Sequence, residues 1–301
     1  MTTTTICTAV YEAARPFLAE WVECAMRAAV LQPVDAVVVS DGVPDIVEIL
    51  EPLRRVVSVT VIPGEGTPAE IRSLMLRAAH SRGSEILVLA DCDDCLTPDA
   101  IELHTTALDS ADFSYGDMEI VDKDGQFLGT NLYEGKEIPE FLNSSSDLAR
   151  RNFVGFGNSA IWRENLRFED CIFPNTVVAP DWWLFTKLLD RGLTGRKTSR
   201  AVGRYRQHGA NLLGNFDGGD IRNRLIKECA VAVAHFEALS EAQSHADLVT
   251  RIRGLQNAIT AGRLSCEDLR ELVNTSRPAW CEAAITAADR LGEIDRGRST
   301  N

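Results

Sequence analysis

The first 90 residues alternate between short apolar runs and stretches with helical spacing. The apolar runs cover residues 6–10, 35–40, 56–62 and 85–90. Runs of this length are typical of strands that are buried on both faces of a sheet. Residues 68–82, between the last two runs, place their apolar side chains three and four positions apart, which predicts a helix. This alternation predicts an α/β fold in which helices cover a mostly parallel sheet.

Proline and threonine mark where further helices are expected to begin. Pro16 suits the first turn of a helix, and the residues after it place Phe17 and Trp21 on one apolar face. A second helix is expected near residues 45–53. Thr97 predicts the cap of a helix whose first residue is Pro98.

The chain changes character twice after residue 110. Residues 112–121 predict one strand, which turns back at Asp122-Lys-Asp-Gly125 into a partner strand over 126–131. Residues 132–215 are rich in glycine and aromatic side chains, which is typical of loops that shape a site. From Asp220 onward apolar residues return at helical spacing. This part predicts a helical cap on the main domain, with a dimerisation element or a lid as the alternatives.

The net charge of −13 limits the classes of partner. A protein that binds nucleic acid tightly needs a basic face that displaces counterions, so we expect no nucleic-acid partner. A phosphate-bearing substrate would need a metal ion or a few arginines to offset the acidity. No stretch approaches the roughly 20 apolar residues that span a bilayer, and the first residues lack the pattern of a signal peptide. We therefore expect a cytoplasmic protein, either free or peripheral to a membrane.

Three aspartates stand directly after the last apolar run, in the sequence Asp91-Cys-Asp93-Asp94. Carboxylates this close together raise one another's pKa unless something compensates for their charge. A divalent cation with oxygen ligands is the natural compensation, and the crevice beyond the strand ends is where open α/β sheets bind ligands. The sequence therefore predicts a metal-assisted site at these three residues.

Other interpretations compete for this segment. The eight cysteines do not suggest a disulfide framework in a chain of this length, but Cys92 and Cys95 form a CxxC that could be redox-active or bind zinc. The neighbouring aspartates disfavour a thiolate, and no second CxxC is present. A haloacid-dehalogenase-like phosphatase using Asp91 and Asp93 is a further alternative, although its signature wants Thr or Val where Cys95 stands. A formal GxGxxA at residues 155–160 is a weak dinucleotide signal without a preceding strand.

A resemblance to a known family extends over roughly residues 5–215. The Asp-x-Asp-Asp pattern followed by Leu96 and Pro98 resembles the inverting family 2 glycosyltransferases of the GT-A fold. Segments that match other parts of that family follow in the same order: Thr8-Ala-Val-Tyr11-Glu12, Val39-Ser-Asp41-Gly42, Phe156-Gly157-Asn158-Ser159, Pro180-Asp181-Trp182-Trp183 and Tyr205-Arg206-Gln207-His208. The family usually has an acidic residue where Pro180 stands here.

The resemblance implies a role for each matched residue. The residues implied for nucleotide-sugar binding are Thr8, Ala9, Tyr11, Glu12, Asp41, Arg72, Asp91, Cys92 and Asp94. Asp93 and His208 would hold Mn²⁺ or Mg²⁺, and Asp181 would be the general base. Residues on the acceptor side would be Gly157, Asn158, Trp182 and Trp183, with one tryptophan stacking on a sugar and the other in the core.

The same resemblance implies an organisation and a reaction. A GT-A (Rossmann-like) domain would cover residues 1–218, with a nucleotide-binding half up to about 130 and an acceptor-side half over about 131–218. A helical C-terminal extension would cover 219–301, and these helices could form a homodimer. A UDP- or TDP-sugar is favoured over a GDP-sugar as the donor, and the acceptor is open. A nucleotide-sugar-binding protein without catalysis and a nucleotidyltransferase remain alternatives, although the latter usually opens with a glycine-rich segment that this chain lacks.

Overall fold

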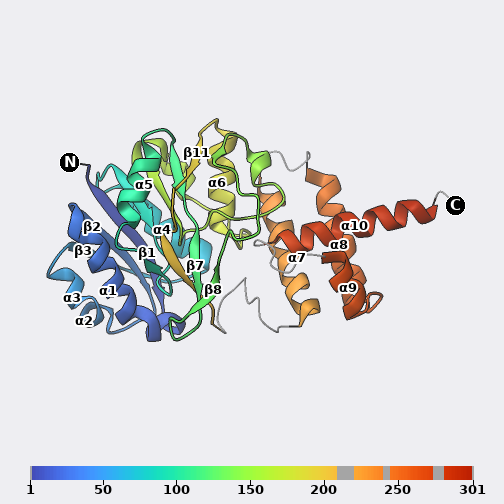
Figure 1. Ribbon diagram of the computed structural model, residues 1–301, viewed down its shortest axis with the longest axis horizontal. Coiled ribbons are helices and arrows are strands. Elements are labelled where there is room, and N and C mark those ends of the chain that lie inside the picture. The colour runs from blue at the N-terminus through green and yellow to red at the C-terminus, as the bar shows by residue number, and fades with distance from the viewer. Residues whose placement is uncertain (1, 209–219, 240–244, 274–280, 300–301) are drawn as a thin grey trace.

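The computed structural model describes residues 2–208, 220–239, 245–273 and 281–299. An α/β body at one end of the molecule carries a group of helices at the other (Figure 1). The larger sheet of the described part has the strand order β3-β2-β1-β4-β10-β6-β11-β9. Its strands are β1 (Thr4–Tyr11), β2 (Val34–Asp41), β3 (Ser58–Gly64), β4 (Ile86–Leu89), β6 (Phe113–Tyr115), β9 (Phe141–Leu142), β10 (Ser159–Trp162) and β11 (Gly195–Lys197).

The first half of this sheet is parallel, as the sequence predicts. β1 pairs in parallel with β2 and β4, and β2 pairs in parallel with β3. Strand β10 then runs antiparallel between β4 and β6. A smaller sheet has the order β5-β12-β7-β8. Its strands are β5 (Cys95–Leu96), β7 (Met118–Val121), β8 (Phe127–Asn131) and β12 (Gly203–Arg206).

Side chains of the central strands point alternately to the two faces of the sheet, and each face packs into a separate apolar core. One face of the sheet, with Ile6 of β1 and Val38 of β2, packs against helices that include α1 and α5. The opposite face, with Cys7 and Val37, packs against α4 and α6. This division follows from the two-residue period of a strand. The helices of this body include η1 (Glu12–Phe17), α1 (Leu18–Ala28), α2 (Ile46–Ile49), α3 (Glu51–Arg54), α4 (Pro68–His80), α5 (Ala100–Leu108) and α6 (Pro180–Asp190).

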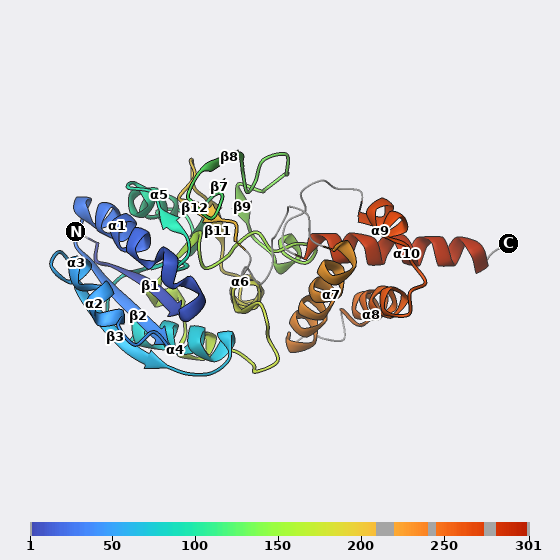
Figure 2. The same ribbon diagram turned by 90° about the horizontal axis from the view of Figure 1, so that it is seen from below.

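The C-terminal part is helical, as predicted, and its core is continuous with that of the α/β body. Its helices are α7 (Ile221–Ala238), α8 (Ala246–Thr260), α9 (Cys266–Val273) and α10 (Glu282–Ser299). Buried side chains of these helices belong to the same apolar cluster as Trp182 and Phe185 of α6. Figure 2 shows α7 beside α6 and α10 running away from the body. Among the described residues, no helix is long and apolar enough to cross a bilayer.

Several local predictions are corrected. Pro16 lies inside η1, a 3₁₀ helix, and the helix expected over residues 45–53 is two short ones, α2 and α3. Thr97 does not cap α5: its N–H donates to the carbonyl of Val202, and α5 begins after Asp99. The strand expected over 112–121 is two strands in different sheets, β6 and β7. The predicted hairpin over 118–131 is confirmed, since β7 pairs antiparallel with β8.

Candidate functional site

The site lies where the chain reverses its direction of travel across the sheet. After β1 the chain builds β2 and β3 on one side, and β4 then returns to the other side of β1. The chain therefore leaves the carboxyl ends of the neighbouring strands β1 and β4 in opposite directions. Such a switch point is where open α/β sheets bind ligands. Tyr11 ends β1, and its register partner Asp41 ends β2. The acidic triplet follows β4 at the same edge.

Asp93 is the meeting point of three segments that lie far apart in the sequence. Its Oδ2 accepts a hydrogen bond from the Tyr11 hydroxyl at 2.8 Å and lies 2.9 Å from Nε2 of His208. Burial acts to raise the pKa of Asp93, but the hydrogen bonds from His208 and Tyr11 outweigh it, and the pKa is lowered. Asp93 is therefore held as a carboxylate next to an imidazole, and the structure brings the two predicted metal ligands together.

The other two aspartates of the triplet have different partners. Asp91 forms an ion pair with Arg72, whose guanidinium lies 5.2 Å from the centre of the Phe156 ring. Burial raises the pKa of Asp91, although Arg72 opposes this. Asp94 accepts a hydrogen bond from the backbone N–H of Arg206 at 2.8 Å, and burial together with the charges of Asp93 and Asp91 raises its pKa well above the ordinary value.

Arg206 holds the triplet to the smaller sheet and was not assigned a role from the sequence. Its buried guanidinium donates from Nε to the carbonyl of Asp93 at 2.9 Å and from Nη2 to Glu20 at 2.6 Å. The guanidinium also lies over the ring of Phe17, 4.9 Å from its centre. The signal that could have indicated this role is the place of Arg206 in the family-like segment Tyr205–His208. An arginine that is buried there needs carbonyl and carboxylate partners, and the acidic turn supplies one of them.

The residues present fit a divalent metal ion whose coordination shell is completed by a bound diphosphate. In the described part of the chain, no three His, Cys, Asp or Glu side chains converge as a preformed metal cluster. Asp93 and His208 together offer one hard oxygen donor and one imidazole. Mg²⁺ is commonly held by one or two carboxylates plus substrate phosphates. Asp93 and His208 would supply the protein ligands, and a diphosphate would supply the others.

At Gly157, the turn that is expected on the acceptor side lies against the triplet. A methyl group on Gly157 would lie 2.9 Å from Oδ2 of Asp94 and 3.1 Å from Oδ2 of Asp91. The neighbouring Asn158 is buried, and its side chain donates to the carbonyl of Gly116 at 2.7 Å and to the hydroxyl of Tyr133 at 2.8 Å. Asn158 therefore fixes the turn from within, and its amide is not presented to an acceptor.

Asp181 lies in the first turn of α6 and shares an electrostatic environment with the triplet. Its Oδ2 accepts from the amide of Asn152 at 3.3 Å, and its Oδ1 accepts from the backbone N–H of Trp182 at 2.8 Å. Burial raises the pKa of Asp181 to about 6, with Asp91 also acting to raise it and Arg72 to lower it. Ala179 occupies the N-cap position, so Asp181 is not the helix cap.

The two tryptophans that follow are core residues, which corrects the expectation that one forms a sugar-stacking wall. Trp182 is fully buried and stacks on His235 of α7, with ring centres 3.8 Å apart and an interplanar angle of 6°. Trp183 packs edge-on against Phe173, and its indole N–H donates to the carbonyl of Ala238. Both indoles are turned towards apolar contacts and the C-terminal helices.

Three residues expected to bind the nucleotide do not present their side chains at the surface. Thr8 and Ala9 are buried inside β1, and Cys92 is fully buried in the core. Burial also raises the pKa of the Cys92 thiol well above its ordinary value. Glu12, by contrast, is exposed and lies 3.5 Å from Arg15.

The cysteines give no support to a CxxC centre. All eight are free, and Cys95 interacts with Cys24 of α1 instead of Cys92. Hydrogen bonding to Cys95, together with Arg27, lowers the pKa of Cys24 to about 7. The glycines of residues 205–214 lead us to expect that this segment closes over a bound donor. The structure describes it as far as His208. Asn211 and Gly214 lie outside the described residues.

Comparisons with known proteins show the fold. No protein-family model and no curated protein matches the sequence. Among solved structures, S. aureus TarS 1-349 matches with a TM-score of 0.56 and 15% identity over 99% of this chain and 92% of that chain. The mannosyltransferase PcManGT from Pyrobaculum calidifontis, in complex with GDP-Man and Mn²⁺, matches with a TM-score of 0.52 and 18% identity over 97% of this chain and 75% of that chain. GalNAc-T7 with UDP, GalNAc and Mn²⁺ matches with a TM-score of 0.56 and 11% identity over 95% and 56%.

These matches share one architecture with this chain along almost its whole length. The protein has the GT-A fold, a mixed α/β body with a large sheet flanked by helices and a helical C-terminal part. This confirms the fold expected from the sequence. At identities of 11–18%, the likeness concerns the fold alone.

Proposed function

We propose that this protein transfers a sugar from a nucleotide-diphosphate sugar to an acceptor hydroxyl, with the help of a divalent metal ion and with inversion at the anomeric carbon. The observation that carries the proposal is the junction at Asp93, where Tyr11 and His208 meet the acidic triplet at the switch point. The matched structures include complexes with UDP-GlcNAc, with GDP-Man and with Mn²⁺, which supports a donor of this class.

The triplet side of the site would hold the donor. A bound Mn²⁺ or Mg²⁺ would neutralise the charge that develops on the leaving diphosphate. Asp93 and His208 are the residues that would hold this ion. Asp41 at the end of β2 lies beside Tyr11 in register, where it could accept a hydrogen bond from the imide of a uridine or thymidine base. We therefore favour a UDP- or TDP-sugar.

Asp181 would take the proton from the acceptor hydroxyl as it attacks. Its pKa of about 6 leaves it mostly ionised at neutral pH while keeping it a stronger base than an ordinary aspartate, which suits general-base catalysis. The charges of Arg72 and Asp91 both act on the pKa of Asp181, and they link this base electrostatically to the donor side of the site. Attack from the side of Asp181, opposite the diphosphate, would invert the anomeric configuration.

The phosphatase and redox alternatives lose their support in this architecture. The buried thiols of Cys92 and Cys95 are poorly placed for exchange, and the fold is that of the GT-A enzymes. A nucleotide-sugar-binding protein without catalysis stays open, and turnover decides between the two. We propose that the protein works in the cytoplasm, and that any homodimer uses the C-terminal helices.

A screen of nucleotide sugars tests the proposal. We expect UDP- or TDP-sugars to raise the melting temperature in the presence of Mn²⁺ and to have a much smaller effect with EDTA. Sugars that stabilise the protein are then incubated with pooled acceptors, and release of the nucleoside diphosphate is measured. Binding without any release would favour the non-catalytic alternative, and stabilisation that is independent of metal would contradict the role of Asp93.

A further inference from the structure

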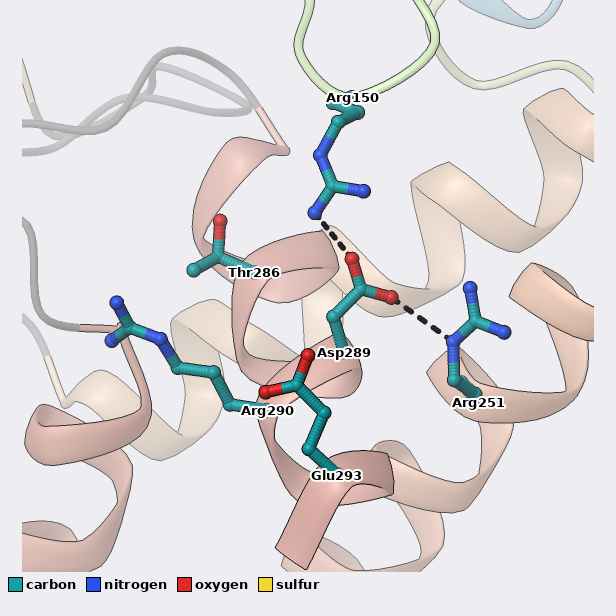
Figure 3. A pocket seen from close by; sticks show the side chains of 6 residues that line it. All are labelled: Arg150, Arg251, Thr286, Asp289, Arg290 and Glu293. Atoms are coloured by element: carbon teal, nitrogen blue, oxygen red, sulfur yellow. Dashed lines mark hydrogen bonds and ion pairs between the residues drawn. The ribbon is translucent and has the colours of Figure 1, made fainter.

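The segment before Asn152 is tied to helix α10. Arg150 forms an ion pair with Asp289, whose second carboxylate oxygen lies 3.0 Å from Nε of Arg251 on α8. Figure 3 shows Asp289 between the two arginines, at the wall of a hollow of about 450 Å³ that Arg150 lines together with side chains of α8 and α10. Arg151, the next residue, lies 3.6 Å from Glu282 at the start of α10.

Glu282 and Asp289 act on the same side of α10. They are two helical turns apart, so their side chains leave the helix in nearly the same direction. Two consecutive arginines of the α/β body are thereby held by one helix of the extension. Asn152 comes directly after them and donates its amide hydrogen to Asp181.

A second set of contacts holds the other side of Asp181. Trp182, the next residue in the chain, stacks on His235 of α7 and donates its indole N–H to the carbonyl of Leu148 at 2.9 Å. α7 is in turn joined to α10, because the buried carboxylate of Glu228 accepts from the backbone N–H of Ala284 at 3.1 Å. Asn152 and Trp182, which both donate hydrogen bonds to the Asp181 carboxylate, are therefore both held through contacts with the extension.

We infer that the helical extension is a positioning element for Asp181: α10 holds the segment that presents Asn152, and α7 holds the start of helix α6. Its meaning for catalysis rests on the proposed function, but the positioning itself can be measured without turnover. A helical cap that only covered apolar surface would need none of the ion pairs to Arg150 and Arg151.

The charges around Asp181 make the positioning measurable. Besides the amide of Asn152 and the N–H of Trp182, Asp91 and Arg72 face it from the triplet side, and Cys281 lies close enough on the extension for its thiol to feel the Asp181 charge. The hydrogen bond from Asn152 lowers the pKa of Asp181. Loss of the hydrogen bond from Asn152 should raise the pKa of Asp181 by about one unit, because the free energy of a hydrogen bond to a charged group corresponds to a pKa shift of about this size.

The test uses the full chain with the double variant Asp289→Asn and Glu282→Gln, which removes both carboxylates without changing their size. The matched control is Glu237→Gln, which breaks the ion pair between Arg253 of α8 and Glu237 of α7 without touching residues 150–152. The pKa of Asp181 is measured by NMR on protein labelled with ¹³Cγ aspartate, and its signal is identified by its loss in Asp181→Asn.

We expect the pKa of Asp181 to rise by about one unit in the double variant and to stay at the wild-type value in the control. Where transfer is measurable, the rate at pH 6 should fall about fivefold, because the ionised fraction of the base falls, and the rate at pH 8.5 should stay the same. The single variant Asp289→Glu keeps a carboxylate at this position and leaves Glu282 unchanged, so its Asp181 should have a pKa close to that of the wild type. An unchanged pKa in a folded double variant overturns the inference. A shifted pKa in a protein that transfers no sugar supports the positioning and overturns the proposed function instead.

Discussion

Replacing Asp181 with asparagine separates a catalytic role from a structural one. Asparagine keeps the shape of the side chain and can accept from the N–H of Trp182, but it cannot take a proton. If Asp181 is the general base, Asp181→Asn should lower turnover by about 10²- to 10⁴-fold. Donor affinity should stay close to that of the wild type, since the donor is expected to bind on the triplet side.

The same change should stabilise the fold. Burial raises the pKa of Asp181 from 3.8 to about 6, so the folded protein binds this proton more tightly than the unfolded chain does. The contribution of Asp181 to stability is greatest below pH 3.8 and is lost as the pH rises through about 6. The loss amounts to about 3 kcal/mol at neutral pH. Asparagine avoids it but gives up one accepted hydrogen bond worth about 1 kcal/mol, so the free energy of unfolding at pH 7.5 should rise by about 1–2 kcal/mol.

Three measurements on one preparation decide the matter: donor affinity by calorimetry, turnover from nucleotide release, and stability from urea unfolding. A catalytic base predicts lost turnover, retained affinity and a gain in stability. A purely structural aspartate predicts lower stability with turnover near that of the wild type. Turnover within about threefold of the wild type would refute the assignment of Asp181, since base removal costs at least about a hundredfold.

Three further predictions follow from the site. The turnover of the wild type should rise about tenfold per pH unit below pH 6 and level off above pH 7, because the pKa of Asp181 is about 6; a flat profile between pH 5 and 7 would contradict this. Asp93→Asn should remove the dependence of nucleoside diphosphate binding on Mn²⁺, measured by calorimetry with and without EDTA, whereas Cys92→Ser with Cys95→Ser should leave that dependence intact. Gly157→Ala should weaken donor binding at least tenfold, because the added methyl group would lie 2.9 Å from a triplet carboxylate; unaltered affinity would show that the turn can move away.

The sequence predicts the parallel half of the fold well because each strand there is a continuous apolar run. The runs around Ile6 and Val37 are buried on both faces, and few other structures accommodate such segments. The second half is harder to predict, because its strands are short and depend on distant partners. Residues 112–121 read as one strand, yet a Cβ atom at Gly116 would lie 2.6 Å from side-chain atoms of Thr198 and Val202, and the chain bends there into a second sheet.

Within the site, the sequence predicts which groups meet but not how they are held. The pairing of Asp93 with His208 follows from the family resemblance, and the structure brings the two side chains together. The supporting residues Arg206 and Asn152 were missed as such, because their roles depend on contacts with segments far away in the chain. The opposite error concerns the two tryptophans after Asp181, one of which was expected to stack on a sugar. The ring of Trp182 instead packs on a helix of the extension.

The stack of Trp182 on His235 also bears on how the protein is made. Asp181 leaves the ribosome long before the extension: at about 5–20 residues per second, α10 follows roughly 5–20 s later and His235 of α7 roughly 3–11 s later. During that interval the indole of Trp182 has no partner from α7, and an apolar face of the α/β body is open to solvent. The contacts that we infer to position Asp181 can therefore be complete only after the extension has been synthesised.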